Sequence, residues 1–125
     1  MIYGIGTDIV EVSRISGSLA HFGSAFAKRI LTDDEYREFE LSKVKARFLA
    51  KRFAAKEAFG KALGTGLRAP VAMQNIGIGH NDLGKPIIVL APELQAWVQQ
   101  RGIKHMHLSI SDEKALAVAF VVLES

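Results

Sequence analysis

The stretch SKVKARFLAKRFAAKEAFGKALGTG (residues 42–66) decides how this chain folds, because it is the longest helical pattern in the sequence. Its spacing predicts a helix over residues 42–63, and Gly64-Thr65-Gly66 supplies a stop and a loop. We expect this helix to lie inside the fold or against a second subunit, because its apolar residues occupy two faces. One face carries Val44, Phe48, Ala55, Phe59 and Ala62, and roughly the opposite face carries Ala50, Phe53, Ala54, Glu57 and Lys61.

The residues before this helix predict a strand and two shorter helices. Residues 1–10 alternate as a strand, with Asp8 on the same face as Gly4 and Gly6. Residues 12–26 follow a helical pattern that we expect Gly23 to interrupt. Thr32 followed three residues later by Glu35 is a capping box, which predicts a helix over residues 32–41.

The residues after the long helix predict two hairpins separated by a helix. Residues 76–80 and 86–90 are strands around a turn at 81–84, and residues 91–100 form a helix with Pro92 near its start. Residues 104–111 and 114–123 form the second hairpin, whose last strand is apolar enough to be buried on both faces. We therefore predict an α+β fold in a single domain, residues 1–125, with a long central helix packed on a small, mostly antiparallel sheet.

The composition excludes several classes of protein. The chain has 125 residues, of which 49% are hydrophobic, so it is large enough to bury a core. The absence of cysteine excludes a disulfide scaffold, a thiolate metal site and a cysteine nucleophile, and it is compatible with a reducing compartment. The first residues lack the pattern of a signal peptide, and no apolar run approaches the ~20 residues of a membrane span. We therefore expect a cytoplasmic protein with no membrane partner.

Basic residues are concentrated in one third of the chain, within an overall net charge of +3. This concentration predicts one positive face and an acidic or polyanionic partner. The residues are Lys28, Arg29, Arg37, Lys43, Lys45, Arg47, Lys51, Arg52, Lys56, Lys61 and Arg68.

Three charged residues are candidates for a site that binds a cation and a phosphate. Asp8 lies within a strand, where aspartate is disfavoured, and the glycines beside it are expected to leave space for a hard cation. The alternative is that Asp8 ends the strand or caps the next helix. Glu57 and Lys61 have the spacing of a simple ion pair, but the alanine-lined face favours a metal or a phosphate-linked ion beside Glu57. The loop 64–66 suits a phosphate and equally suits an ordinary helix end.

Other features also leave two interpretations open. His105 and His107 face one way on a strand, and contact with an anion is favoured over a metal pair because no further ligand lies nearby. Gly60 inside the long helix indicates tight packing or a close approach to the backbone. Phe22, Phe26 and Phe53 among basic residues suit either the core or a groove for an acidic helix or a nucleic acid.

Two motifs, Gly6-Thr7-Asp8 and RFAAKEAFGKALGTG (residues 52–66), occur together with weaker pieces at residues 29–32, 84–86 and 107–111. In order, spacing and chain length they resemble the holo-[acyl-carrier-protein] synthase family, the short, single-domain 4'-phosphopantetheinyl transferases. The resemblance spans nearly the whole chain. It implies the 4'-phosphopantetheinyl transferase fold and a homotrimer with active sites between subunits.

The resemblance also implies a reaction and its catalytic residues. The reaction is transfer of 4'-phosphopantetheine from coenzyme A to a serine hydroxyl of apo acyl carrier protein, which releases adenosine 3',5'-bisphosphate and supports fatty acid biosynthesis. The implied cofactor is Mg²⁺, with Asp8 and Glu57 as its protein ligands and Lys61 beside the same diphosphate oxygens. Glu57 is in addition a candidate for the base that takes the serine proton.

Further residues match the family's binding positions. For coenzyme A they are Arg52, Lys61, Gly64, Thr65, Gly66, Pro86, His107 and Ser109, of which Arg52, Pro86, His107 and Ser109 match the adenosine 3'-phosphate end. For the carrier protein they are Arg14, His21, Phe22, Phe26, Lys28 and Arg29. The chain departs from the family in having fewer arginines in its first helix, and in having Gly60 where many relatives carry serine.

Two other functions compete with this interpretation. A small basic nucleic-acid-binding module would use the basic third of the chain, but no signature of a recognition helix, RRM or KH domain is present, so we expect no nucleic-acid partner. A trimeric scaffold without catalysis would have no use for the set Asp8, Glu57 and Lys61.

Overall fold

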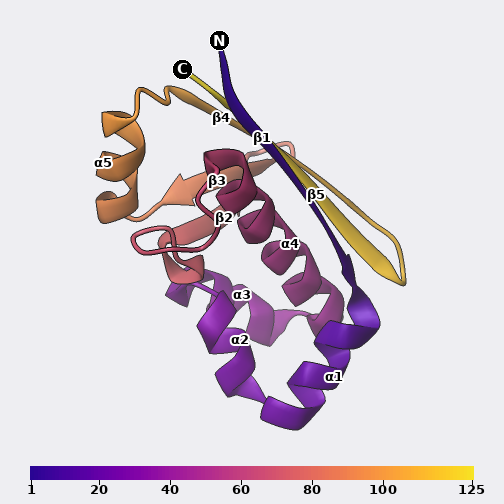
Figure 1. The fold of residues 1–125 in the computed structure, drawn as a ribbon. Coiled ribbons are helices and arrows are strands. Elements are labelled where there is room, and N and C mark those ends of the chain that lie inside the picture. The colour runs from indigo at the N-terminus through magenta and orange to yellow at the C-terminus, as the bar shows by residue number, and fades with distance from the viewer.

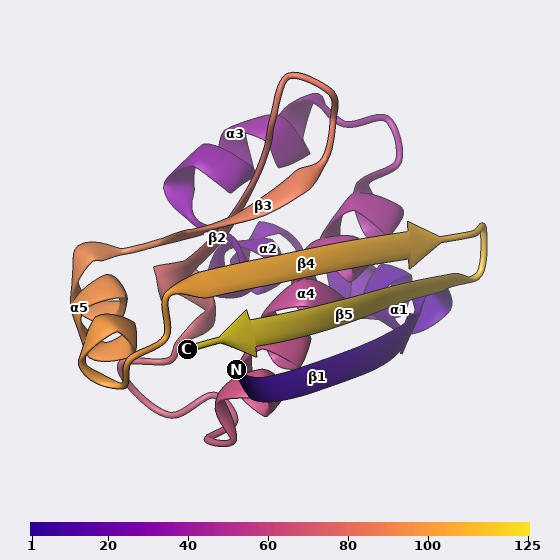
Figure 2. The same cartoon turned by 90° about the horizontal axis from the view of Figure 1, so that it is seen from above.

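A three-stranded antiparallel sheet and one long helix form the centre of the molecule. In the computed structural model, which describes residues 1–125, β1 (Ile2–Glu11), β5 (Leu116–Glu124) and β4 (His105–Asp112) lie in that order. Helix α4 (Lys45–Leu63) packs on one face of this sheet, mainly against β1 and β5 (Figures 1 and 2). The buried hydrophobic side chains form one cluster around α4. The predicted α+β class and central helix are confirmed.

The opposite side of α4 is covered by the same chain. Helices α1 (Val12–Phe22), α2 (Ser24–Ile30) and α3 (Asp33–Leu41) contact it there (Figure 1). Gly23 separates α1 from α2 as predicted, with φ 65°, although α2 continues four residues beyond the predicted end at residue 26. The two apolar faces of α4 are therefore explained by packing within one chain.

Helix α4 begins three residues later than its predicted start at residue 42. Ser42 has an extended backbone, and its hydroxyl accepts a hydrogen bond from the backbone N–H of Val44. Val44 precedes the helix and is 56% exposed. The prediction that Val44 belongs to the buried stripe is wrong, because this local hydrogen bond favours a turn over a continued helix.

A second, two-stranded sheet lies beside the first. It consists of β2 (Ile76–His80), which follows the 3₁₀ turn η1 (Met73–Asn75), and β3 (Pro86–Leu90). Both strands have their predicted bounds, because Asn81 Oδ1 accepts the backbone N–H groups of Leu83 and Lys85 and closes the turn. Helix α5 (Pro92–Gln100) follows as predicted. None of the helices has the length and hydropathy of a bilayer-spanning helix.

Strand β5 is buried on one face only. Ala117, Ala119, Val121 and Leu123 are buried, whereas Phe120 on the other face is 44% exposed. The prediction of burial on both faces is wrong, because helices cover only one side of the sheet. The outer face also exposes Ile5 and Ile9 of β1.

Two glycines bring β1 into direct contact with the backbone of α4. A Cβ atom on Gly4 would lie 2.0 Å from the carbonyl oxygen of Ala62, and one on Gly6 would lie 2.0 Å from that of Ala58. The expected open space beside Asp8 is therefore occupied by the helix itself, which corrects the prediction. The glycines serve close packing of strand on helix, and this packing brings Asp8 toward α4.

A buried charged cluster ties α3, α4 and β2 together. Thr32 and Glu35 form the predicted capping box. Glu35 also accepts a hydrogen bond from Lys56 Nζ at 2.6 Å and one from the backbone N–H of Ile78 at 3.0 Å. Arg52 Nε lies 3.3 Å from the same carboxylate. Burial lowers the pKa of Lys56, and Glu35 opposes this effect.

Candidate active site

Asp8, Glu57 and Lys61 meet where β1 crosses α4. Lys61 Nζ donates to Asp8 Oδ1 at 3.1 Å and to the carbonyl oxygen of Thr7 at 2.9 Å. The possible ion pair between Glu57 and Lys61 is not formed, since Lys61 reaches across to the strand instead. Asp8 neither ends β1, which continues to Glu11, nor caps α1, whose N-cap residue is Glu11. Both simple alternatives from the sequence are thus excluded.

Glu57 is the member of this set whose charge is least compensated. Its carboxylate has no hydrogen-bond partner within 3.5 Å and no basic group within 4.0 Å. Burial raises the pKa of Glu57, the nearby Asp8 carboxylate raises it further, and Lys61 opposes both effects. A positive charge placed between the two carboxylates would relieve their repulsion.

The residues present fit a magnesium ion that arrives with a substrate phosphate. No group of three or more metal-ligating side chains exists in the chain, so the protein offers two carboxylates and not a complete cage. Mg²⁺ in proteins commonly binds one or two carboxylates and takes its other oxygens from phosphate and water. Asp8 and Glu57 are suited to that donor set.

The turn after α4 offers one free backbone donor. The N–H of Gly64 bonds to the carbonyl oxygen of Lys61, and that of Gly66 bonds to Gly60, whereas that of Thr65 has no protein acceptor. Gly64 has φ 80°, as expected for a helix end. A Cβ atom on Gly60 would lie 3.1 Å from the carbonyl carbon of Gly66, so tight packing accounts for this glycine.

The other residues assigned to coenzyme A by resemblance lie apart from this set. Arg52 is buried beside Glu35, and Pro86 begins β3. His107 and Ser109 lie on β4, where Ser109 is paired with Phe120 on the outer face of the sheet. Asp8 is paired with Ala119 and faces α4. One chain therefore does not bring His107 and Ser109 together with Asp8.

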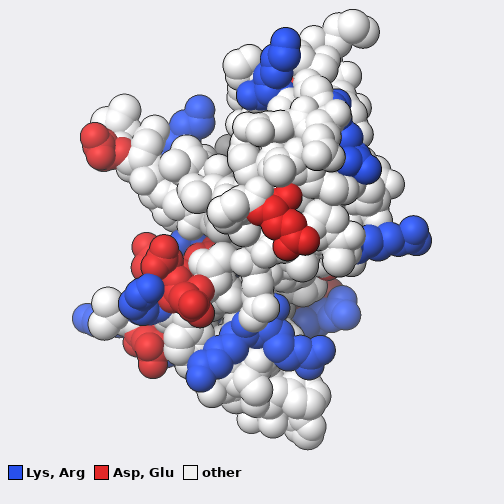
Figure 3. All heavy atoms as spheres, turned by 90° about the vertical axis from the view of Figure 1, so that its left-hand side faces the viewer, with Lys and Arg blue, Asp and Glu red and all other residues white.

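The residues assigned to the carrier protein lie on α1 and α2. Arg14, His21, Phe22, Lys28 and Arg29 are exposed, and the rings of His21 and Phe22 form an edge-to-face pair at 4.5 Å. Phe26 is partly buried and packs against the core. Figure 3 shows basic side chains gathered on the lower part of one face, with acidic side chains to their left and above them.

The expected single positive face is only partly present. Arg52 and Lys56 are buried, and three other basic residues have carboxylate partners: Arg37 with Asp34, Arg47 with Asp112 and Lys61 with Asp8. The pairs of Arg47 with Asp112 and of Lys61 with Asp8 join residues distant in the chain, so sequence spacing did not indicate them, whereas Arg37 and Asp34 are only three residues apart. The free positive charge is therefore smaller than composition predicts.

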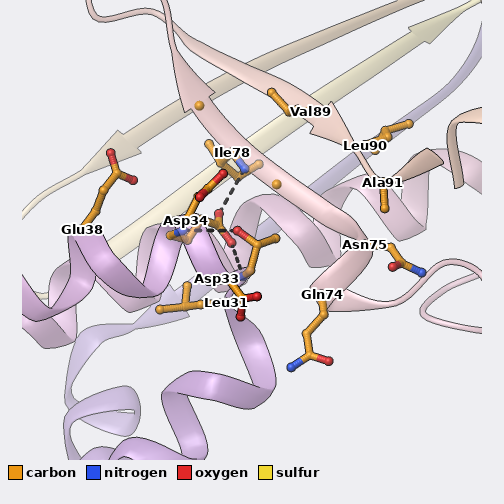
Figure 4. A pocket seen from close by; sticks show the side chains of 14 residues that line it. Leu31, Asp33, Asp34, Glu38, Gln74, Asn75, Ile78, Val89, Leu90 and Ala91 are labelled. Carbon is orange, nitrogen blue, oxygen red and sulfur yellow. Dashed lines mark hydrogen bonds between the residues drawn. The ribbon is translucent and has the colours of Figure 1, made fainter. Parts of the chain in front are cut away.

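Sequence reasoning also missed a hollow of about 760 Å³ between α3 and the β2–β3 hairpin (Figure 4). Asp33, Asp34, Glu35 and Glu38 line it, and no lysine or arginine does. An acidic lining of this kind repels a diphosphate. None of the lining residues belongs to the set Asp8, Glu57 and Lys61, so the hollow is distinct from it.

Comparison with known proteins places this geometry in a family. Residues 4–121 match the family model described as the 4'-phosphopantetheinyl transferase superfamily. A holo-[acyl-carrier-protein] synthase of Nitrosospira multiformis is 58% identical over 124 residues, which cover 99% of either chain.

Solved structures agree with the sequence matches. The fold is similar to the crystal structure of holo-[acyl-carrier-protein] synthase from Neisseria meningitidis, with a TM-score of 0.97, 54% identity and full coverage of both chains. It is also similar to the Bacillus anthracis enzyme in complex with CoA (3',5'-ADP), with a TM-score of 0.84, 42% identity and coverage of 100% and 98%. The chain therefore belongs to the 4'-phosphopantetheinyl transferase superfamily, within its holo-[acyl-carrier-protein] synthase family.

Proposed function

We propose that this chain transfers the 4'-phosphopantetheine group of coenzyme A to a serine hydroxyl of apo acyl carrier protein, in support of fatty acid biosynthesis. The observation that carries the proposal is the set Asp8, Glu57 and Lys61, held together at the crossing of β1 and α4 in a chain of this family. The cytoplasm is the proposed location, since the substrates are coenzyme A and a carrier protein of fatty acid synthesis.

The step is an attack of the serine oxygen on the phosphorus next to the pantetheine group. The new bond joins serine oxygen to that phosphorus, the phosphorus–oxygen bond to the nucleotide breaks, and adenosine 3',5'-bisphosphate leaves. Lys61 places an ammonium group beside the diphosphate oxygens and offsets their charge. Glu57 is the proposed acceptor of the serine proton through one water, since its carboxylate has no hydrogen-bond partner within the chain.

Magnesium is part of the proposal, with Asp8 and Glu57 as its protein ligands. When bound, the ion would neutralise charge on the diphosphate and orient it for attack. The two carboxylates supply the negative charge that such an ion requires, and Lys61 is the group that balances Asp8 without it.

A homotrimer with active sites between subunits is also proposed. The support is the position of His107 and Ser109, which lie on the outer face of the sheet while Asp8 faces α4. A coenzyme A molecule that touches both sets must therefore contact two chains. The exposed Ile5, Ile9 and Phe120 on that outer face are suited to burial against a second copy.

The first experiment is intact-mass measurement of apo acyl carrier protein after incubation with this protein, coenzyme A and Mg²⁺. We expect a mass gain of one phosphopantetheine that disappears when EDTA is added. Absence of a gain with a carrier protein that a related synthase modifies would contradict the proposed function.

The carboxylates are tested by Asp8→Ala and Glu57→Ala in the same assay. We expect a loss of about 10²- to 10³-fold in kcat, comparable to removal of a group that stabilises charge in the transition state. Near-normal rates with Mg²⁺ would contradict the assignment. Circular dichroism of each variant shows whether the fold is retained.

Arg14, His21, Phe22, Phe26, Lys28 and Arg29 are proposed to form the carrier-protein contact. Acyl carrier proteins are acidic, so Arg14→Glu should raise KM for the carrier protein, most strongly at low salt. Lys104→Glu, which changes an exposed lysine at the end of the sheet away from α1, is the matched control. An unchanged KM for Arg14→Glu at low salt would remove Arg14 from the contact.

Nucleic-acid binding is not the function favoured by this structure. Arg52, Lys56 and Lys61 have internal partners, so the basic third of the chain offers no continuous track for a phosphate backbone.

A further inference from the structure

A histidine and a glutamate form an isolated pair on the outer face of the sheet. His107 on β4 and Glu124 at the end of β5 share a hydrogen bond between Nε2 and Oε1 of 2.5 Å. His107 is directly paired with Val122, and Glu124 with His105, so the pair is a diagonal contact between neighbouring strands. In a single chain both side chains are accessible, at 52% for His107 and 39% for Glu124.

This contact uses one ring nitrogen of His107 and leaves the other unpaired. Nδ1 has no hydrogen-bond partner within the chain. The hydrogen bond from His107 lowers the pKa of the Glu124 carboxyl, and the positive charges of His107, His105 and the N-terminal amine act in the same direction. Glu124 is thus kept as a carboxylate that accepts the Nε2 proton.

We propose that Glu124 is a positioning residue for coenzyme A, which holds Nε2 of His107 so that Nδ1 is free to donate to the 3'-phosphate. The inference rests on the proposed function and on the family resemblance, which assigns His107 to the adenosine 3'-phosphate end of coenzyme A. The new claim is that Glu124 acts through His107 and does not itself touch coenzyme A.

The physical reason is orientation of an exposed ring. A histidine on a strand rotates about its side-chain bonds unless a partner holds one nitrogen. With Nε2 bound to Glu124, the ring has one orientation and one free nitrogen. When both ring nitrogens of His107 carry protons, the imidazolium lies between the 3'-phosphate and the Glu124 carboxylate. Each of its two hydrogen bonds then joins opposite charges.

An alternative role for Glu124 makes the opposite prediction. A carboxylate near a phosphate site can also compete with the phosphate for the histidine, and its removal would then strengthen coenzyme A binding. The sign of the change in affinity therefore distinguishes positioning from competition.

The experiment compares Glu124→Gln with wild type in the transfer assay and in direct calorimetric binding, using coenzyme A and 3'-dephospho-coenzyme A. We expect KM and Kd for coenzyme A to rise about three- to fivefold, as for loss of an exposed charge pair, with kcat unchanged. Values for 3'-dephospho-coenzyme A should not change. Glu113→Gln is the control, since Glu113 is an exposed glutamate with no side-chain partner at the far end of the same strands.

A second measurement tests whether Glu124 acts through His107. In a His107→Gln background, Glu124→Gln should add no further change in Kd, because the ring that it orients is gone. Ring ¹⁵N spectra of wild type should show Nε2 protonated and hydrogen-bonded, and Glu124→Ala, which has no side-chain acceptor, should remove that signature.

Several results would overturn the proposal. They are an unchanged or tighter Kd for coenzyme A in Glu124→Gln, an equal loss for 3'-dephospho-coenzyme A, or additive effects in the double variant. Failure of the wild type to modify any carrier protein would instead overturn the proposed function, and the calorimetric comparison would still decide the role of Glu124 in coenzyme A binding.

Discussion

Lys56 and Glu57 are neighbours in the chain, yet they belong to two charged clusters on different sides of α4. Lys56 is completely buried, and its ammonium donates to Glu35, to the carbonyl oxygen of Ile30 and to that of Met73. Glu57 is partly exposed and has no hydrogen-bond partner. Two adjacent residues of one helix therefore differ. The Lys56 ammonium has an acceptor for each of its three donors, whereas the Glu57 carboxylate has no hydrogen-bond donor beside it.

The difference separates a structural role from a functional one. A lysine has three N–H donors, and Lys56 uses all of them within the protein, so no ligand can bind it. Glu57 keeps its acceptor capacity, and burial together with the nearby Asp8 raises the pKa of its carboxyl, so an added cation would stabilise the site. In this helix, an unsatisfied charge is the better indicator of function.

The largest expected effect comes from breaking the buried cluster of Lys56, Glu35 and Arg52. Lys56→Met removes the cation and leaves the buried Glu35 without its closest partner. We expect a loss of about 3–5 kcal/mol in the free energy of unfolding, measured by urea denaturation. Combining Lys56→Met with Glu35→Gln should cost less than the sum of the two single variants, since both remove the same contact between Lys56 and Glu35. Equal stability of Lys56→Met and wild type would contradict the structural role.

A smaller effect is expected from changing how closely β1, which carries Asp8, packs against α4, which carries Glu57 and Lys61. Gly6→Ala places a Cβ atom against the carbonyl oxygen of Ala58, so β1 or α4 must shift. We expect a loss of about 1–3 kcal/mol in stability together with a lower kcat, because Asp8 moves relative to Glu57. The control is Gly17→Ala, where nothing lies within 4 Å of the added atom and a helix gains stability. If Gly6→Ala matched that control, close packing would not position Asp8.

The smallest effect is expected from removing the charge of Glu57, which should stabilise the set Asp8, Glu57 and Lys61 in the metal-free protein. Burial raises the pKa of Glu57 in the folded state, so the folded protein binds this proton more tightly than the unfolded chain does. The stability gained from protonation is present below the ordinary pKa of 4.5 and is lost as the pH rises through the higher folded value. Glu57→Gln should therefore stabilise the metal-free protein near neutral pH and not at acid pH.

The expected gain for Glu57→Gln is below about 1 kcal/mol, since solvent screens a group that is only partly buried. Urea denaturation in EDTA at both pH values measures it. A gain of equal size at acid pH would assign the effect to something other than the carboxylate charge. The same variant should lose transfer activity, which separates stability from catalysis.

Local signals in the sequence predicted much of the fold. The capping box at Thr32 and Glu35, the helix break at Gly23 and the turn at Asn81 each depend on residues within a few positions of one another. Such signals act before the chain is packed, so they are visible in the sequence. The bounds of β2 and β3 were predicted correctly for this reason.

The long-range contacts were not predictable in the same way. Lys61 pairs with Asp8 across 53 positions, and Lys56 bonds to the carbonyl oxygen of Ile30 across 26. The helical pattern correctly placed Glu57 and Lys61 on one face, but it could not show that Lys61 would turn to the strand. Burial of Arg52 and Lys56 likewise depends on Glu35, whose capping role was recognised and whose wider network was not.

The glycines of β1 make the position of Asp8 a condition of folding. If β1 slipped by one residue against β5, Ile5 and Thr7 would face α4 at the points where Gly4 and Gly6 leave no room for a Cβ atom. The helix could not then close on the sheet, and Asp8 would point to the outer face. A chain in which this slip misplaces the Asp8 carboxylate therefore also exposes its hydrophobic core, which chaperones and proteases recognise. Quality control of folding thus also removes molecules whose active site is wrongly assembled.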